Sequence, residues 1–215
     1  MNARLQFISI LFAAIAVSFV PIIHWPFSWL ETYFHELSHG LLAILSGGRI
    51  QYIELHFRGS GLCVTSGGWQ AAVAFAGYFG AVFWGVAIYK TVSAAHAKVS
   101  SLFTGMLLVT LLLTALLWAR DLETLVIMSI LFFLFLAITK YGNKSVVKVA
   151  LQFSGLYVLT NAARSPLVLL DGQSIGDGAT LATLTWIPEI VWVAIWTFVS
   201  MIGLWVVWPK KMKRS

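Results

Sequence analysis

The sequence predicts an all-α, polytopic membrane protein, a bundle of about six or seven transmembrane helices with one small β-hairpin. Two observations support this fold class. The 215 residues are 60% hydrophobic and only 10% charged, whereas soluble domains carry about 25% charged residues. The apolar residues are also gathered into long stretches, and a span needs about 20 of them to cross the bilayer core. We therefore expect residues 1–215 to form one integral, multi-pass domain, with the cell membrane as its location.

The expected spans follow one another with short polar connections. The apolar stretches fall near residues 5–23, 28–46, 69–89, 101–118, 123–139, 146–170 and 187–208. The first stretch follows Arg4 and is similar to the apolar region of a signal peptide, but no clear small-x-small cleavage site follows it. We expect it to be retained as a span.

The net charge of +6 does not indicate a nucleic-acid-binding protein. The basic residues lie between the apolar stretches, as Lys140 and Lys144 do, and such placement is typical of charge that flanks a membrane. The ten Trp residues also suit the bilayer interface. The single cysteine, Cys63, excludes an intramolecular disulfide and a Cys-rich metal site. The lipid bilayer is thus an expected partner and nucleic acid is not.

Residues 49–66 differ from the apolar stretches on either side. Gly47 and Gly48 can end the preceding helix. The next residues alternate in polarity and include β-branched types, and a Gly-rich turn at 58–61 precedes a second short run of the same kind. This pattern predicts a β-hairpin at the membrane surface.

The clearest functional motif is His35-Glu36-Leu37-Ser38-His39, inside an expected apolar helix. Residues four apart share one helix face, so the two imidazoles can bind one Zn²⁺, and Glu36 can act as general base on the water that the metal activates. Three ionisable groups so close together are costly in hydrocarbon unless they bind something or face a polar cavity. The motif therefore indicates a functional site and not a chance match.

A catalytic zinc site uses three protein ligands and leaves one position open. The polar loop 171–186 offers Asp171 and Asp177. Four expected spans separate this loop from the 47–68 loop, and since four is even, both loops lie on the same face of the membrane. Either aspartate could instead be a solvated loop acid, and Asp177 would also suit a helix N-cap. The residues alone leave the choice between the two open.

Asn161 is a further candidate, because it lies within or near the sixth expected span. Polar groups at such depth usually pair with one another or line a cavity. We expect Asn161 to hold a substrate backbone or to orient a ligand.

At these residues the chain resembles the site-2 protease family of intramembrane zinc metalloproteases (family M-50), and its M-50B-like branch most closely. The matching segments are 35–40, 46–49, 59–68, 76–80 and 176–179. The resemblance implies a metalloprotease domain with His35 and His39 as metal ligands, Glu36 as base and a distal aspartate as third ligand. Pro166-Leu-Val-Leu-Leu-Asp171-Gly172 is similar to a motif of the wider family and favours Asp171, whereas the terminal block of the branch favours Asp177.

The sequence thus leads to the hypothesis of a zinc-dependent endopeptidase that hydrolyses a peptide bond in or near a transmembrane segment of a membrane-protein substrate. The alternative is a non-proteolytic metal-binding scaffold or pseudoprotease, for which Glu36 would be dispensable. A transporter would need more acidic residues inside its spans than this chain has.

Two indications of membrane orientation oppose each other. The family resemblance implies that the loop after the zinc helix faces the cytosol. The positive-inside rule instead places Lys140, Lys144, Lys210 and Lys211 on the cytosolic side, which would put that loop outside. Both orientations stay open at this point.

Overall fold

A computed structural model describes residues 2–94, 97–173 and 175–209 of the chain. The elements, in chain order, are α1 (Ala3–Val17), α2 (Trp25–Leu45), β1 (Arg49–Leu55), β2 (Gly61–Ser66), α3 (Gln70–Ala94), α4 (Ala97–Leu117), α5 (Leu122–Tyr141), α6 (Lys144–Arg164), the 3-10 helix η1 (Ser165–Asp171), α7 (Asp177–Thr185) and α8 (Glu189–Val207). Most of the expected stretches therefore correspond to one helix each.

Five of the described helices are long and apolar enough to cross a membrane, namely α3, α4, α5, α6 continued by η1, and α8. Helix α1 is apolar but shorter. Large apolar side chains on the outside of the bundle, such as Leu102, Phe133 and Phe198, are more than 60% exposed, as a lipid-facing surface requires. The prediction of a mostly helical, multi-pass membrane protein is confirmed.

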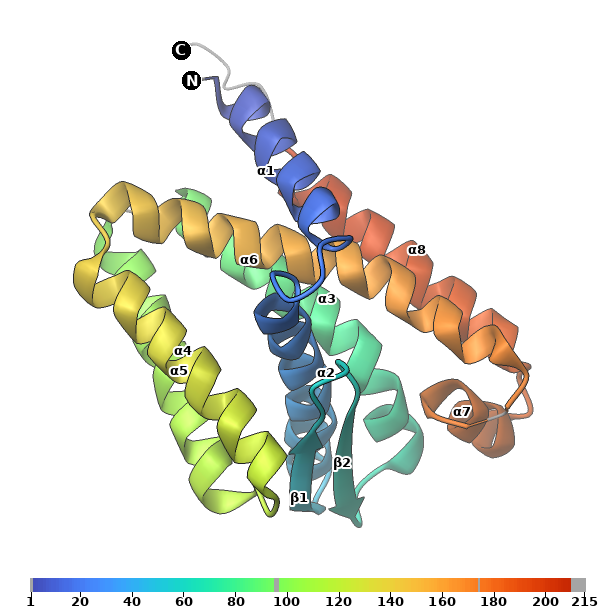
Figure 1. Ribbon diagram of the computed structural model, residues 1–215. Helices are drawn as coiled ribbons and strands as arrows, with labels where there is room; N and C mark the ends of the chain where they lie inside the picture. The colour runs from blue at the N-terminus through green and yellow to red at the C-terminus, as the bar shows by residue number, and fades with distance from the viewer. Residues whose placement is uncertain (1, 95–96, 174, 210–215) are drawn as a thin grey trace.

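Helix α2 lies in the middle of the molecule, with the hairpin along one side and α3 behind it (Figure 1). Its Tyr33 is fully buried, and its Phe34 stacks on Trp84 of α3 with ring centroids 5.1 Å apart. Helices α3 and α6 approach closely at Gly85 and Gly155, because a Cβ at either glycine would come within 3.0 Å of the other's carbonyl oxygen. Small residues at such crossings let membrane helices pack backbone to backbone.

The hairpin predicted from residues 49–66 is present and is built into the bundle. Strands β1 and β2 pair antiparallel, from Arg49 opposite Ser66 to Leu55 opposite Gly61. The outer edge of β1 is also hydrogen-bonded, since the Ile53 N–H donates to the carbonyl of Trp118 at 3.0 Å. The Leu55 N–H donates to the hydroxyl of Thr124 at 2.7 Å. The hairpin is therefore held between α2 and the α4–α5 turn, which leaves β2 as the edge strand.

The α4–α5 turn is set by an N-cap. The Asp121 carboxylate accepts the backbone N–H of Thr124 at 2.8 Å, which satisfies one of the free donors at the start of α5. Burial alone would raise the pKa of Asp121, but the hydrogen bonds from Thr124 outweigh it and hold the pKa below its ordinary value. The cap thus supports the same turn that holds the hairpin.

We expect Asp121→Ala to lower the free energy of unfolding by about 1 kcal/mol, the usual effect of losing an N-cap. Thermal unfolding in detergent would measure this change. Asp121→Asn is the matched control, because its side chain can still accept the Thr124 N–H. Since the folded pKa lies below the ordinary value of 3.8, the stabilisation should be present at neutral pH and should disappear as the pH falls below that value. If the difference in the free energy of unfolding between the wild type and Asp121→Ala stayed constant down to low pH, this would contradict a cap that depends on the charge of Asp121.

Candidate metal centre

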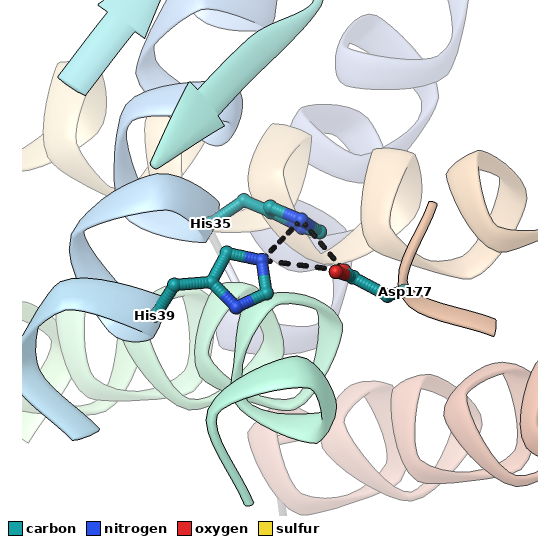
Figure 2. A group of neighbouring side chains, drawn as sticks. All are labelled: His35, His39 and Asp177. Carbon is teal, nitrogen blue, oxygen red and sulfur yellow. Dashed lines mark hydrogen bonds and ion pairs between the residues drawn. The ribbon is translucent and has the colours of Figure 1, made fainter. Parts of the chain in front are cut away.

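The two histidines of the motif come together with one aspartate from the far end of the chain (Figure 2). His35 and His39 lie one turn apart on α2, and their Nε2 atoms are 3.0 Å from each other. Asp177, the first residue of α7, places Oδ2 3.1 Å from Nε2 of His35 and 3.2 Å from Nε2 of His39. No other group of this kind occurs in the described part of the chain.

The triangle formed by these three atoms fits a tetrahedral metal ion. Ligand atoms about 2.0–2.1 Å from a tetrahedral Zn²⁺ are about 3.3–3.4 Å apart, so the observed separations of 3.0, 3.1 and 3.2 Å need to widen only by a few tenths of an ångström. Two imidazole nitrogens and one carboxylate oxygen are also a donor set that catalytic zinc sites use. Three protein donors leave the fourth position open.

His39 is held in the tautomer that metal binding needs. Its Nδ1 lies 2.6 Å from the carbonyl oxygen of Val73 on α3. A carbonyl can only accept, so Nδ1 must carry the proton, and in the neutral ring Nε2 then presents its lone pair toward His35 and Asp177. Hydrogen bonds of this kind fix the ring orientation of metal-ligating histidines.

Gly77 of α3 makes room for the imidazoles. A Cβ at this position would overlap Nε2 of both His35 and His39. The next residue, Tyr78, contacts the ring of His35 edge-on with centroids 4.5 Å apart. Helix α3 therefore lies against the two imidazoles, with a glycine where the nitrogens converge and an aromatic ring beside it.

Asp177 reaches the imidazoles because of the backbone just before it. Gly176 has a φ of 104°, a conformation that residues with a Cβ rarely adopt, and α7 begins directly after it. Burial would raise the pKa of the Asp177 carboxyl, but the charge and the hydrogen bonds of His39 and His35 outweigh it and hold the pKa well below the usual range. Asp177 is therefore ionised at neutral pH.

Glu36 lies next to this triangle and faces the hairpin. Its side chain is 5% exposed, and its carboxylate accepts a hydrogen bond from the backbone of Cys63 in β2. A Cβ at Gly61 would come within 2.8 Å of Oε1 of Glu36, so strand β2 lies directly over the carboxylate. The carboxyl group is thus positioned by the edge strand of the hairpin.

The triangle and Glu36 line one cavity of about 960 Å³. Strand β2 forms one wall, and η1 and α7 form another, with Val168, Thr180 and Thr183 among the lining residues. Cys63 also lines this cavity, and burial, reinforced by the charges of Glu36 and Asp177, raises the pKa of its thiol to about 12. This thiol stays protonated at neutral pH and is a poor ligand beside the three charged or imidazole donors.

Asn161 is hydrogen-bonded to Glu31, a residue that lines the cavity. Its amide donates to Oε2 of Glu31 at 3.0 Å, and the hydroxyl of Ser165 donates to Oε1 at 3.3 Å. Arg164 in turn donates to the amide oxygen of Asn161 at 3.2 Å. Glu31 itself lines the cavity one turn before His35. The structure thus joins Asn161 to α2, where it holds a second buried carboxylate.

Asp171 lies away from the two imidazoles. It is exposed at the end of η1, and its Oδ1 accepts the backbone N–H of Gln173 at 2.8 Å. Of the two aspartates that the sequence left open, only Asp177 is brought to His35 and His39. Asp171 instead closes a local turn.

Gly77 and Tyr78 were not predicted from the sequence as residues of the site. The pair Gly77-Tyr78 belongs to a segment that carried the family resemblance, but nothing in the spacing shows which residues of α3 face α2. Glu31 was predicted to belong to the cavity or its rim, because it lies one turn before His35 and residues four apart share one helix face, and it does line the cavity.

The chain was also compared with known proteins. A family model described as Peptidase M50B-like matches residues 7–207. No curated protein and no solved structure matches the chain. The match covers most of the chain, including the two histidines, Glu36 and Asp177.

We expect Gly77→Ala to lower the metal affinity of the protein about tenfold or more, the range found when residues that orient metal ligands are changed. The added Cβ has to displace both imidazoles. Metal titration of the detergent-purified protein would measure the affinity. Gly105→Ala is the matched control, because a Cβ on α4 at Gly105 meets no atom within 4 Å. Equal affinities in the two variants would contradict the role given to Gly77.

Proposed function

The chain belongs to the Peptidase M50B-like family, and we propose that it is a zinc-dependent intramembrane endopeptidase that hydrolyses a peptide bond in or near a transmembrane segment of a membrane-protein substrate. Membership of this family implies a metallopeptidase. The proposal goes further in naming the metal, the residues and the kind of substrate. The observation that carries it is the convergence of His35, His39 and Asp177 in a bundle of membrane helices.

We assign His35, His39 and Asp177 as the metal ligands. Their donor set and spacing fit zinc, and Gly77 leaves the space that the converging nitrogens need. A bound zinc ion would supply a Lewis acid and a water acidified to a pKa of about 7. Asp171 is not part of this ligand set.

Glu36 is the proton carrier in this proposal. Its carboxylate lies beside the ligands at the wall of the cavity, where it can take a proton from the attacking water and later give it to the leaving amine. Both steps need the carboxylate near the scissile bond but not bound to the metal. The Cys63 backbone and the closely packed Gly61 hold it in that place.

Strand β2 offers a place for an extended substrate segment. A helical substrate has to unwind before its carbonyl can be attacked, because helix hydrogen bonds occupy its backbone. The hairpin has two strands, and β1 is already bonded on both sides, so β2 is the strand whose outer edge pairs with no other strand in the described part of the chain. Residues 61–63, 65 and 66 of β2 line the cavity, and strand addition there would place a peptide next to Glu36.

We expect Asp177→Ala to abolish stoichiometric zinc binding and Asp171→Ala to leave it unchanged. The first substitution removes one of three protein ligands, whereas the second removes an exposed loop carboxylate. Elemental analysis of the purified proteins, after zinc loading and dialysis, would measure zinc per chain. Retention of zinc by Asp177→Ala together with its loss in Asp171→Ala would reverse the assignment.

We expect Glu36→Gln to lower the cleavage rate about 10²–10⁴-fold, the usual contribution of a general acid–base group, while zinc content stays unchanged. New N-termini in membranes from cells that express the wild type or Glu36→Gln would identify substrates and measure cleavage together. His35→Ala is the second reference, because it removes the metal as well.

Glu36→Gln and His35→Ala together distinguish a peptidase from a non-proteolytic metal-binding protein. Cleavage products that are present with the wild type and absent with both variants support a peptidase. Products that persist at the same level with Glu36→Gln would contradict it and would favour a non-proteolytic metal-binding protein.

A further inference from the structure

The basic residues of this protein are distributed unequally between its two ends. One end, here called the terminal face, consists of the start of α1, the end of α3, the α5–α6 turn and the end of α8. The other end, here called the site face, consists of the turns at 46–48, 67–69 and 118–121 and the η1–α7 segment. In Figure 1 the terminal face lies at the top and the site face at the bottom and lower right.

Side-chain contacts show that the parts of the terminal face belong together. Nε of Arg4 donates to the carbonyl of Pro209 at 3.4 Å, which joins the start of α1 to the end of α8. The amide of Gln6 donates to Gln152 of α6 at 3.0 Å, and Gln152 donates to Ser93 of α3 at 2.9 Å. Four helices are thus tied together near this end of the bundle.

The terminal face is basic. Its described part carries five basic residues and no acidic one, and these are Arg4, Lys90, Lys140, Lys144 and Lys148. Lys90, Lys140 and Lys144 are exposed. Four more basic residues follow Pro209 in the sequence, outside the described residues.

The site face and the interior hold the acidic residues. All eight acidic residues of the chain lie in segments 31–54, 121–123 and 171–189. The site face carries few basic residues. Of these, Arg120 donates to the carbonyls of Ala119 and Leu117 at the end of α4, and Arg49 donates to Ser66, so both serve local structure.

We propose that the terminal face is the cytosolic face and rests on the anionic headgroups of the cytosolic leaflet, while the metal centre opens toward the opposite side of the membrane. Loops that remain in the cytosol are enriched in Lys and Arg within about 15–20 residues of the span ends. Anionic lipids of the cytosolic leaflet attract basic segments near the surface. In this orientation the distribution of charge over the two faces agrees with both rules. In the reverse orientation it would agree with neither.

The metal centre lies nearer the site face. His39 is bonded to Val73, one turn after the start of α3 at Gln70, and Asp177 lies on the η1–α7 segment. If the site acts as the peptidase proposed above, it cuts its substrates in the half of the bilayer away from the cytosol. Only this consequence rests on the proposed function, and the orientation itself does not. This orientation is the reverse of the one that the family resemblance implies.

Cysteine accessibility in intact cells tests the orientation without any measurement of cleavage or metal. The background is the full chain with Cys63→Ala, since Cys63 is the only native cysteine. Single cysteines are then introduced by Gln173→Cys on the site face and Tyr141→Cys on the terminal face, where both native residues are exposed. Leu102→Cys, on the lipid-facing side of α4, is the control that a membrane-impermeant maleimide should not label.

The proposal expects Gln173→Cys to be labelled equally in intact and permeabilised cells, and Tyr141→Cys to be labelled only after permeabilisation. The opposite pattern, or labelling of neither residue in intact cells, would overturn it. A second variant, with Lys140, Lys144 and Lys148 all changed to Gln, tests the lysines themselves. It should give a measurable population in which Gln173→Cys is protected, and an unchanged labelling ratio would remove the lysines as the cause of the orientation.

Discussion

The structure depends on one constraint, which is that a cluster of ionisable groups has to be stable inside an apolar bundle. Glu31, His35, Glu36 and His39 all lie on α2, the helix at the centre of the molecule (Figure 1). Uncompensated charges at such depth are expensive. Each of these side chains is therefore met by a polar partner from another element: α7 supplies Asp177, α3 supplies the Val73 carbonyl, β2 supplies the Cys63 backbone, and α6 supplies Asn161.

These partners need close backbone approach, and glycine provides it. Without a Cβ at Gly77, helix α3 can lie against the two imidazoles, and without one at Gly61, strand β2 can lie over Glu36. The hairpin in turn is fixed by its bonds to the α4–α5 turn. The helices that surround α2 therefore do more than bury apolar area, because they position the groups that neutralise and orient its charged face.

The helical membrane fold and the core of the site could be predicted because their signals are local. Span length and the four-residue spacing of His35 and His39 can be read directly, and so can the alternation that marks the hairpin. The choice between Asp171 and Asp177 could not be made this way, because it depends on the path of η1 and on the backbone turn at Gly176. The pairing of Asn161 with Glu31 joins residues 130 positions apart, and no periodicity within one helix reveals such a contact.

We propose that two imidazoles and one carboxylate hold a zinc ion, and X-ray absorption at the zinc edge on the purified, lipid-reconstituted protein would detect these ligands. We expect one zinc per chain with nitrogen and oxygen ligands at about 2.0–2.1 Å, together with the outer-shell scattering of two imidazole rings. Absence of stoichiometric zinc would contradict it. So would a sulfur ligand at about 2.3 Å, because that would replace one of the three donors with Cys63, the only cysteine in the chain.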